Sequence, residues 1–313
     1  MPKDTYDIVI IGGGPAGLTA GIYAGRAKMK TLLLEKNFYG GQVLLTDIIE
    51  NFPGFPDGIK GPDLMEQFIL QAKNVGLNVL NAEAKKLVVE KDAFKVIIDD
   101  GEEFGASTVM IATGASWNPL NVPGEKELTG RGVSYCATCD GPLFKDKEVV
   151  VVGGGDKAVG DALFLAKFAK KVTIVHRRDE LRAAKILQDR VFAAENIEIA
   201  WNSVVTKISG KSKVEAVTLK DVRDNKESDL RCNGIFVLIG IRPNSGLAKG
   251  VVDTDESGYI LTDDSMKTSA RGIFACGDVR KKVLRQIVTS CGDGATAAFA
   301  AQHYIEAHRS MPR

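Results

Sequence analysis

The chain has 313 residues, of which 44% are hydrophobic and 26% charged, and its 41 basic and 40 acidic residues almost cancel. This composition is typical of a globular protein of about two domains and excludes a disordered or fibrous chain. The balanced charge gives no support for a nucleic-acid-binding footprint or a membrane-surface patch.

The N-terminal stretch MPKDTYDIVIIGGGPAG has one short apolar run that leads directly into glycines. It lacks the basic region and the small-residue cleavage site of a signal peptide. No apolar stretch approaches the roughly 18 residues of a membrane-spanning helix. We therefore expect a cytoplasmic protein without a membrane partner, in which the five cysteines are mostly thiols.

The first 36 residues follow the pattern of a complete βαβ unit. The expected strand, helix and strand cover residues 7–11, 16–27 and 31–34. The glycines that match G-x-G-x-x-G after the first strand are Gly12, Gly14 and Gly17. They permit a tight turn, close approach to a pyrophosphate and close helix–strand packing. Glu35 ends the second strand, where a carboxylate suits an unphosphorylated ribose, as in the AMP half of FAD.

The stretch after this unit alternates turns with short periodic segments. Glycines and prolines at 40–62 precede an amphipathic helix at about 61–75, and alternating strand patterns follow near 77–98 and 106–111. Residues 112–125, ATGASWNPLNVPGE, are rich in Gly, Pro and Asn and are typical of a linker.

Cys136 and Cys139 form a Cys-x-x-Cys pair that is followed directly by Asp140. Such a pair can be half of a zinc site or a redox dithiol. A zinc site needs four ligands, and no second cysteine pair or suitably spaced histidine is present. The spacing therefore favours a redox dithiol and predicts no metal. For Cys232, Cys276 and Cys291, which have no close partner, we expect no redox role.

A second βαβ pattern occupies residues 147–183, with expected strands at 149–152 and 172–175. Its fingerprint residues are Gly153, Gly155 and Ala158. Basic side chains, not an acid, follow the second strand: His176, Arg177, Arg178 and Arg182. Guanidinium groups pair with phosphate in a fork geometry, so this site is predicted to bind the 2′-phosphate of NADPH. A flavin site beside a nicotinamide site indicates a path for hydride.

The C-terminal third has neither a dithiol nor a fingerprint of its own. We expect a hairpin-like stretch at 197–230, strands at 234–240 and 271–279, a linker at 241–247 and a small-residue helix at 292–308. We infer that the tail completes the first domain. The predicted fold is α/β, with two Rossmann-like three-layer dinucleotide-binding domains. The FAD-binding domain covers 1–116 and 245–313, and the NADPH-binding domain with the dithiol, 117–244, is inserted into it.

The ordered motifs of the whole chain resemble the low-molecular-weight thioredoxin reductases. These motifs include GGGPAG (12–17), YCATCDG (135–141), HRRDELRA (176–183) and RQIVTSCGDGATAA (285–298). A CATC dithiol inside the NADPH domain is specific to this group.

The resemblance implies a role for each matching residue. FAD would be contacted by Gly12, Gly14, Gly17, Glu35, Gly41, Gln42, Asn51, Asp278, Arg285, Gln286 and Ala295. Asp278 would bind the flavin's ribityl chain. NADPH would be held by Gly153, Gly155, Ala158, His176, Arg177, Arg178 and Arg182. Cys136 would attack the substrate disulfide, Cys139 would face the flavin, and Asp140 would act as the acid or base.

The resemblance further implies a homodimer that reduces thioredoxin. Electrons would pass from NADPH to FAD, then to the disulfide and then to thioredoxin. Because the dithiol and the nicotinamide site belong to one inserted domain, both cannot serve one flavin in a single arrangement. We therefore expect a rotation between the domains, with hinges near 115–124 and 242–246.

The chain departs from the family pattern on the helix that follows the second fingerprint. Gly160 and Asp161 stand where paired acids are common, and Lys157 stands where a small hydroxyl residue is usual. These changes bear on how the nicotinamide half is positioned and on the preference for NADPH over NADH.

Other functions share parts of the pattern. The reductase of an alkyl hydroperoxide system normally carries an extra N-terminal dithiol module, for which 313 residues leave no room. Ferredoxin–NADP⁺ reductases of similar fold lack CATC, and dithiol oxidases that use O₂ usually lose the arginine cluster. A reductase of another thioredoxin-like protein and a non-enzymatic flavin redox sensor remain alternatives.

Overall fold

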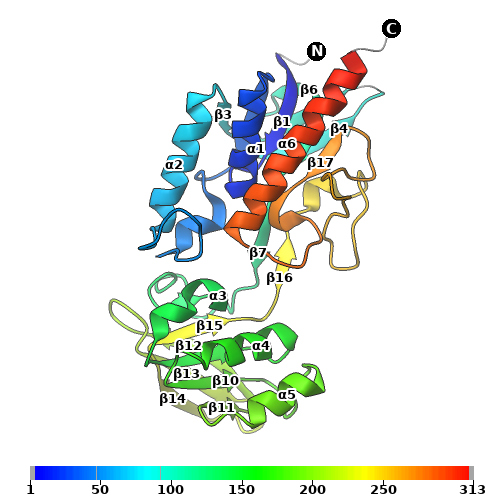
Figure 1. Cartoon of the computed structure of the whole chain (residues 1–313). Coiled ribbons are helices and arrows are strands. Elements are labelled where there is room, and N and C mark those ends of the chain that lie inside the picture. Colours follow the sequence, from blue (N-terminus) through cyan, green and yellow to red (C-terminus); the bar gives the residue numbers. More distant parts are fainter. Residues whose placement is uncertain (1–3, 47, 92, 310–313) are drawn as a thin grey trace. The chain divides into compact units, whose positions relative to one another are not determined.

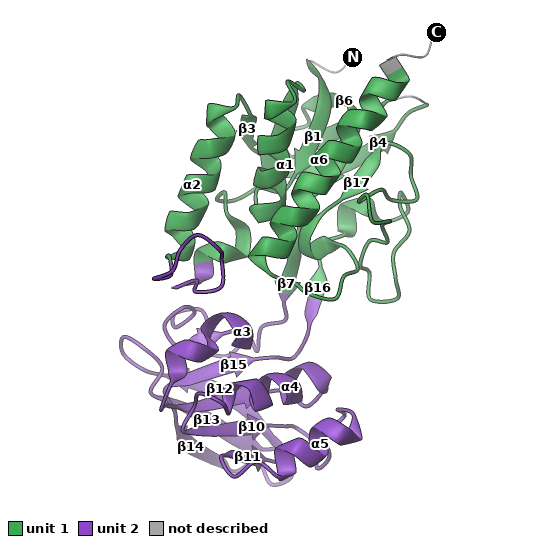
Figure 2. Ribbon diagram, viewed as in Figure 1, with its two compact units in different colours: residues 1–44, 59–116, 242–313 green, residues 45–58, 117–241 purple. Residues whose placement is uncertain are grey.

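The structure is a computed structural model that describes residues 4–46, 48–91 and 93–309. The chain forms two compact units (Figure 2). Unit 1 comprises residues 1–44, 59–116 and 242–313, and unit 2 comprises residues 45–58 and 117–241. The sequence arguments did not assign 45–58 to the second unit. The assignment of an FAD-binding and an NADPH-binding domain stays a prediction.

Unit 1 is built on a seven-stranded sheet in the order β3-β2-β1-β6-β5-β4, with β17 also beside β6. Its strands are β1 (Asp4–Ile11), β2 (Thr31–Glu35), β3 (Asn78–Asn81), β4 (Ala84–Val89), β5 (Phe94–Ile98), β6 (Glu103–Ile111) and β17 (Ile273–Ala275). The first half of β6 pairs antiparallel with β5, and its last residues pair parallel with β17. The parallel strands β3, β2, β1, β6 and β17 therefore end at one carboxyl edge.

Three helices cover one face of this sheet (Figure 1). They are α1 (Pro15–Arg26), α2 (Gly61–Asn74) and α6 (Ile287–Arg309), and α1 contacts both of the others. Val9 and Ile11 of β1 belong to an apolar cluster with residues of β4 and β5, whereas the alternate residues Ile8 and Ile10 are fully buried on the opposite side. Burial on both faces explains the continuous apolar run of β1.

The C-terminal helix begins at Ile287, five residues before the predicted start at 292. Gly292 and Gly294 lie inside α6, as the predicted helix had them, and residues 287–291 extend the helix at its start. A Cβ atom on Gly294 would overlap the carbonyl oxygen of Ala16 on α1. Gly294 is therefore required by the close approach of two helices, and it marks no helix end.

Unit 2 contains a fully parallel five-stranded sheet in the order β11-β10-β9-β15-β8. Its strands are β8 (Val133–Ser134), β9 (Glu148–Val152), β10 (Lys171–Val175), β11 (Ile197–Ala200) and β15 (Gly234–Val237). A second sheet is antiparallel and consists of β12 (Ser203–Ser209), β13 (Ala216–Asp221) and β14 (Glu227–Arg231). The helices are α3 (Ala137–Asp140), α4 (Asp156–Leu165) and α5 (Lys185–Phe192).

Strand β9 shows how unit 2 is layered. Val149 and Val151 pack with residues of α4 and α5, and Val150 and Val152 pack with residues of the antiparallel sheet. The parallel sheet is thus the middle of three layers. The predicted α/β class with two Rossmann-like units is confirmed.

Short 3₁₀ turns and a two-stranded ribbon complete the fold. The turns are η1 (Gly41–Leu45), η2 (Gly141–Phe144), η3 (Gly246–Ala248) and η4 (Gly277–Val279). The ribbon pairs β7 (Ala115–Trp117) with β16 (Ile241–Pro243), and it contains the points at which the chain passes from residues 116 to 117 and from 241 to 242. Asn244 fastens its unit 1 end, because its side chain bonds both Thr113 and Ser116.

The close contact between α1 and α6 predicts opposite outcomes for two neighbouring glycines. Gly294→Ala should lower the free energy of unfolding by about 1–3 kcal/mol, because the added methyl group has no room. Gly292→Ala, whose Cβ would meet no atom within 4 Å, should be neutral or raise stability by about 0.5–1 kcal/mol. Urea unfolding followed by circular dichroism measures both, and equal effects would contradict the packing.

Candidate functional site

The first fingerprint lies at the carboxyl edge of the unit 1 sheet, between β1 and α1. Gly12 has a φ of +110°, and a Cβ there would overlap the carbonyl oxygen of Ala112. A Cβ on Gly17 would overlap the carbonyl oxygen of Gly12, so the third glycine permits the close helix–strand contact. A Cβ on Gly14 would meet no protein atom within 4 Å, which leaves open space for a ligand beside the start of α1.

Glu35 follows the second strand and is tied to the fingerprint. Its carboxylate accepts hydrogen bonds from the backbone N–H of Gly13 at 2.7 Å and of Asn37 at 2.9 Å. Each carboxylate oxygen has a further lone pair, so the group can still accept bonds from ribose hydroxyls. Gly41 lies next to Gly14, and the Gln42 amide donates to the carbonyl of Ala115. These residues fit an FAD-type nucleotide, although their individual contacts stay predictions.

The C-terminal residues predicted to contact FAD lie between the end of β17 and the first turns of α6. Asp278 is in η4, and its Oδ1 accepts a 3.2 Å hydrogen bond from Ser290. The Arg285 guanidinium lies 4.1 Å from the ring centroid of Tyr259, and its buried Nε has no hydrogen-bond partner in the described part of the chain. The backbone N–H of Gln286 donates to Thr289, and Ala295 lies on α6, half-buried.

Sequence reasoning missed a buried ionic cluster in the same region. Lys282 and Arg280 contact Asp293 at 3.1 and 3.2 Å, and Lys282 also contacts Asp278 at 3.3 Å. The run RKK at 280–282 has the composition of a solvated loop. The one signal in the sequence was the presence of an acid on each side of this run, Asp278 and Asp293, with which Arg280 and Lys282 could form buried ion pairs.

The second fingerprint has the same arrangement in unit 2. Gly153 has a positive φ, and its Cβ would lie 2.6 Å from that of Ala158, so helix and strand approach closely. A Cβ on Gly155 would meet nothing within 4 Å, which again leaves space at the start of α4. This open space fits the approach of a dinucleotide pyrophosphate.

The basic residues after β10 differ in solvent exposure: the three arginines are exposed and the histidine is buried. Arg177, Arg178 and Arg182 are exposed, and none forms an ion pair with another described residue, so all three can meet a phosphate. His176 is only 5% exposed and packs over Gly154. Burial lowers the pKa of its ring, which favours the neutral imidazole. Its Nε2 has no hydrogen-bond partner in the described part of the chain, and its contact with NADPH stays a prediction.

On α4, the lysine that departs from the family pattern pairs with the acid that remains there. Lys157 forms an ion pair with Asp161 four residues later, at 2.5 Å, and Asp161 is 8% exposed. The lysine therefore neutralises the remaining acid of this helix. A Cβ on Gly160 would meet nothing within 4 Å, so the position of the missing acid is open.

Cys136 and Cys139 form a disulfide, with their Cα atoms 5.3 Å apart. Both side chains are half-buried, and Cys136 Sγ lies 3.4 Å from Thr138 Oγ1. The pair follows β8 and includes α3, which packs on α4. Because β8 and β9 are parallel members of one sheet, the dithiol and the second fingerprint lie at the same carboxyl edge. Asp140, the next residue, is half-buried.

Tyr135 anchors the chain directly before the disulfide. Its ring stacks on Trp117 with centroids 6.1 Å apart, and its hydroxyl donates to the buried carboxylate of Glu125 at 2.9 Å. Burial and this bond raise the pKa of the phenol. Glu125 also accepts from the backbone N–H of Leu120 and Asn121. None of these residues was predicted from sequence.

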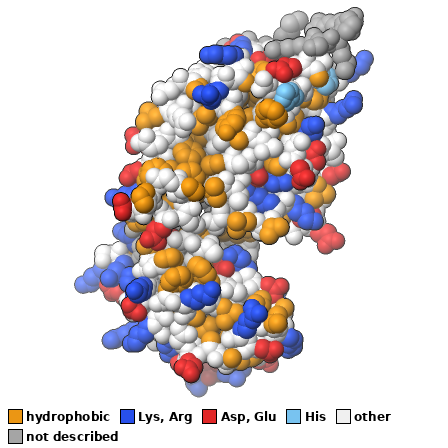
Figure 3. Space-filling model, viewed as in Figure 1, with side chains coloured by type: hydrophobic (Ala, Val, Ile, Leu, Met, Phe, Trp, Pro, Cys, Tyr) orange, Lys and Arg blue, Asp and Glu red, His pale blue; other side chains and the backbone are white. Residues whose placement is uncertain are grey.

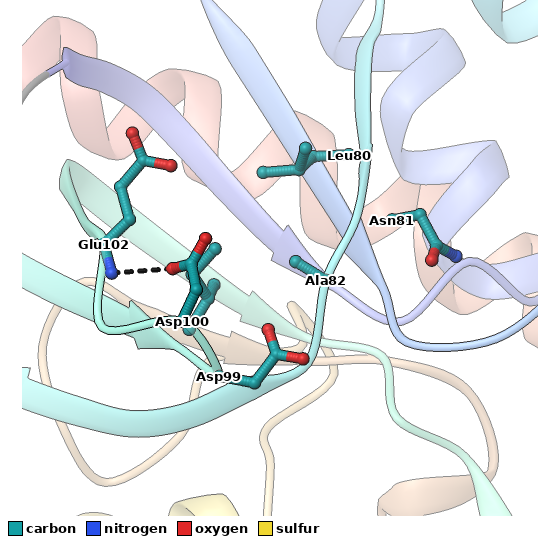
Figure 4. A pocket seen from close by; sticks show the side chains of 7 residues that line it. Leu80, Asn81, Ala82, Asp99, Asp100 and Glu102 are labelled. Atoms are coloured by element: carbon teal, nitrogen blue, oxygen red, sulfur yellow. Dashed lines mark hydrogen bonds between the residues drawn. The ribbon is translucent and has the colours of Figure 1, made fainter.

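The described residues form other recesses, and one of them includes Asn51, a residue predicted to contact FAD. Asn51 lines a shallow pocket formed by residues 50–56 in unit 2. A pocket of about 370 Å³ in unit 1 is lined by Asp99, Asp100 and Glu102 beside Asn81 (Figure 4). Three carboxylates would repel a pyrophosphate, so this pocket is unsuited to the phosphates of a dinucleotide.

Two further findings concern metal ligands and membrane-spanning helices among the described residues. Residues 4–46, 48–91 and 93–309 contain no group of three or more His, Cys, Asp or Glu side chains placed to hold a metal ion. Among their helices, none has both the length and the apolar character needed to cross a bilayer.

Comparisons with known proteins point to one family. Residues 6–294 match the pyridine nucleotide-disulphide oxidoreductase family. The thioredoxin reductase of Bacillus subtilis is 48% identical over 96% of this chain and 95% of its own. The thioredoxin reductase structure from Streptococcus pyogenes, at 46% identity, has a TM-score of 0.93 and covers 97% of this chain and 99% of that one. The one from Lactococcus lactis (FR conformation), at 44% identity, has a TM-score of 0.67 and covers 96% and 99%.

Burial of the other cysteines predicts how the thiols react. Burial raises the pKa of Cys232 and of Cys276 to about 12, and it also raises that of Cys291. At pH 8 a thiol with a pKa near 12 is ionised in only about one molecule in ten thousand, so alkylation of the oxidised protein should be slow. Reduction should add two fast-reacting thiols, mapped by mass spectrometry to Cys136 and Cys139. A fast adduct on Cys232 or Cys276 would contradict this assignment.

Proposed function

The chain belongs to the pyridine nucleotide-disulphide oxidoreductase family, and we propose on that basis that it is a thioredoxin reductase that uses FAD and NADPH. The observation that carries the proposal is the Cys136–Cys139 disulfide at the same sheet edge as the second fingerprint. A dithiol at a dinucleotide site is suited to exchange electrons with a protein disulfide.

The residues present fit both cofactors. Open space at Gly14 and Gly155, each beside the start of a helix, supports two pyrophosphate sites. Glu35 favours the unphosphorylated ribose of FAD, and the exposed arginines favour the 2′-phosphate of NADPH. When bound, NADPH supplies a hydride and FAD passes its two electrons to a disulfide.

Reduction opens the Cys136–Cys139 disulfide and leaves two thiols. The Cys136 thiolate then attacks the disulfide of thioredoxin, forms a mixed disulfide and displaces one thioredoxin thiolate, which takes up a proton. The Cys139 thiolate next attacks Cys136 Sγ, re-forms the disulfide and releases the second thioredoxin thiolate. The net reaction moves two electrons and two protons to thioredoxin.

Asp140 adjoins Cys139 and would exchange the proton of that thiol. A half-buried carboxyl in the residue that follows Cys139 is suited to this exchange, because general acid–base catalysis needs a proton carrier close to the reacting group. Tyr135, fixed by Glu125 and Trp117, would hold the position of Cys136.

A change in the orientation of the two units would let the dithiol serve flavin and thioredoxin in turn. The relatives from Streptococcus pyogenes and Lactococcus lactis have almost the same identity to this chain, 46% and 44%, but TM-scores of 0.93 and 0.67. The two relatives therefore differ in structure by more than their sequences require. This difference supports a rotation in the family, and β7 and β16 are the connections in this chain where it would occur.

The homodimer and the cytoplasmic location also stay predictions. Exposed apolar side chains on the helices of unit 1 support contact with a second copy; they are Tyr23, Leu70, Val288 and Phe299. The face in Figure 3 mixes acidic and basic side chains, so no surface of one charge favours a nucleic acid there.

A coupled assay with NADPH or NADH, thioredoxin and a disulfide reporter tests the function. The parent protein should turn over faster with NADPH than with NADH, because Arg177, Arg178 and Arg182 meet the 2′-phosphate. Cys136→Ser and Cys139→Ser should abolish thioredoxin reduction, and NADPH should still bleach the flavin in both. Cys291→Ser serves as the matched control and should keep turnover within about twofold, since this thiol takes no part.

Other outcomes would replace the proposal. Flavin bleaching by NADPH without turnover of thioredoxin would favour a redox sensor. Turnover only with another thioredoxin-like protein or a peroxiredoxin-system protein would change the substrate and retain the chemistry.

A covalent cross-link between the units tests the rotation. The cross-linked protein should bind FAD as the parent does and lose multiple turnovers, since the dithiol could not visit both partners. Cleavage of the cross-link should restore activity. Unchanged turnover in a verified cross-linked species would exclude a required rotation.

A further inference from the structure

We propose that Lys282 and Asp293 are positioning residues for FAD, which hold one carboxylate oxygen of Asp278 so that the other oxygen can bind a hydroxyl of the flavin's ribityl chain. The inference rests on the proposed function, because it takes FAD as the ligand. It adds two residues to those that the family resemblance implied.

The two oxygens of Asp278 have different surroundings. Oδ1 accepts from Ser290 Oγ at 3.2 Å and lies 3.3 Å from Lys282 Nζ. Within the described part of the chain, no hydrogen bond reaches Oδ2. The Asp278 side chain is 31% exposed, so its second oxygen is open to a ligand. One anchored and one open oxygen is an arrangement suited to bind a single hydroxyl in a fixed direction.

Lys282 is the most buried charge of this group. Its side chain is only 7% exposed, and Nζ lies within 3.4 Å of Thr289, Ser290, Asp278 and Asp293. A buried ammonium needs opposite charges and hydrogen-bond acceptors, and these four side chains provide them. Lys282 also separates two carboxylates that would otherwise repel each other.

Asp293 connects this group to α6 and to the turn that carries Asp278. One oxygen of Asp293 accepts from the backbone N–H of Gly277 and from Lys282, both at 3.1 Å. The other oxygen pairs with Arg280 at 3.2 Å, and Arg280 also donates to Thr262. Asp293 therefore fixes the residue directly before Asp278.

The position of the group agrees with a ligand site and not only with a structural one. Gly277 lies against Ala16 at the start of α1, next to the first fingerprint. The turn follows β17, so it belongs to the carboxyl edge where open α/β sheets bind nucleotides. Two cations, Arg280 and Lys282, balance two carboxylates there and hold the Asp278 side chain in one orientation without adding net charge.

FAD binding to the full-length protein after removal of the flavin tests the inference. Lys282→Met should raise the dissociation constant of FAD by about tenfold or more. This is the size expected for the loss of a charge-assisted hydrogen bond. Lys282→Arg should restore most of the affinity, and Asp293→Asn should also weaken binding. The neighbouring exposed Lys281→Met is the matched control and should stay within about twofold. Titration of flavin fluorescence gives these constants, and the flavin absorption spectrum reports the environment of the ring.

A double-mutant cycle separates positioning from general stability. In an Asp278→Asn background, Lys282→Met should change FAD affinity by no more than about twofold, because its effect passes through the carboxylate. An equal loss in both backgrounds would overturn the inference and make the cluster purely structural. Unchanged affinity and spectrum in folded Lys282→Met would overturn it as well. Failure of the parent protein to bind FAD would instead refute the proposed function.

Discussion

The close contact between α1 and α6 brings the C-terminal part of the chain beside the first glycine fingerprint. Gly294 lets α6 lie against the first turn of α1, and this contact places the end of the chain beside a fingerprint that is more than 260 residues earlier in sequence. Asp278, the ionic cluster and the start of α6 then lie at the same sheet edge as Gly12 and Gly14. The predicted FAD site draws on both ends of the chain, and Gly294 permits the close helix contact that brings them together.

Unit 2 is built on a fully parallel sheet that supports the second fingerprint and the dithiol in different ways. Strand β9 is buried on both faces. Packing on two sides therefore fixes the end of the strand and the turn that leads from it into α4. The dithiol follows a two-residue edge strand, β8, and gains its support from Tyr135, Glu125 and the packing of α3 on α4. The nucleotide site is thus embedded in the core, whereas the dithiol lies at the margin, where a large protein disulfide can approach.

Local patterns predicted the parts of this molecule that depend on neighbours in sequence. Both glycine fingerprints, their strands and the disulfide follow from spacing within about 40 residues, and the disulfide joins the predicted pair. The start of α6 was placed five residues too late, at 292 instead of Ile287. The Lys282 cluster was missed because its ion pairs depend on how the turn after β17 packs on α6. The pairing of Lys157 with Asp161 depends only on helical spacing. It could have been predicted if the new lysine and the remaining acid had been considered together.

The paired strands β7 and β16 bear on how such a chain could have evolved. Because they are neighbours in one ribbon, the points where the chain enters and leaves residues 117–241 lie about 5 Å apart. A segment whose two ends are adjacent can take the place of a tight turn in another unit. Its insertion, duplication or exchange then leaves the core of that unit intact. On the unit 1 side of the ribbon, the Asn244 side chain links the two chain segments through its hydrogen bonds to Ser116 and Thr113. Adjacent ends of this kind are what insertion of residues 117–241 into another unit would leave.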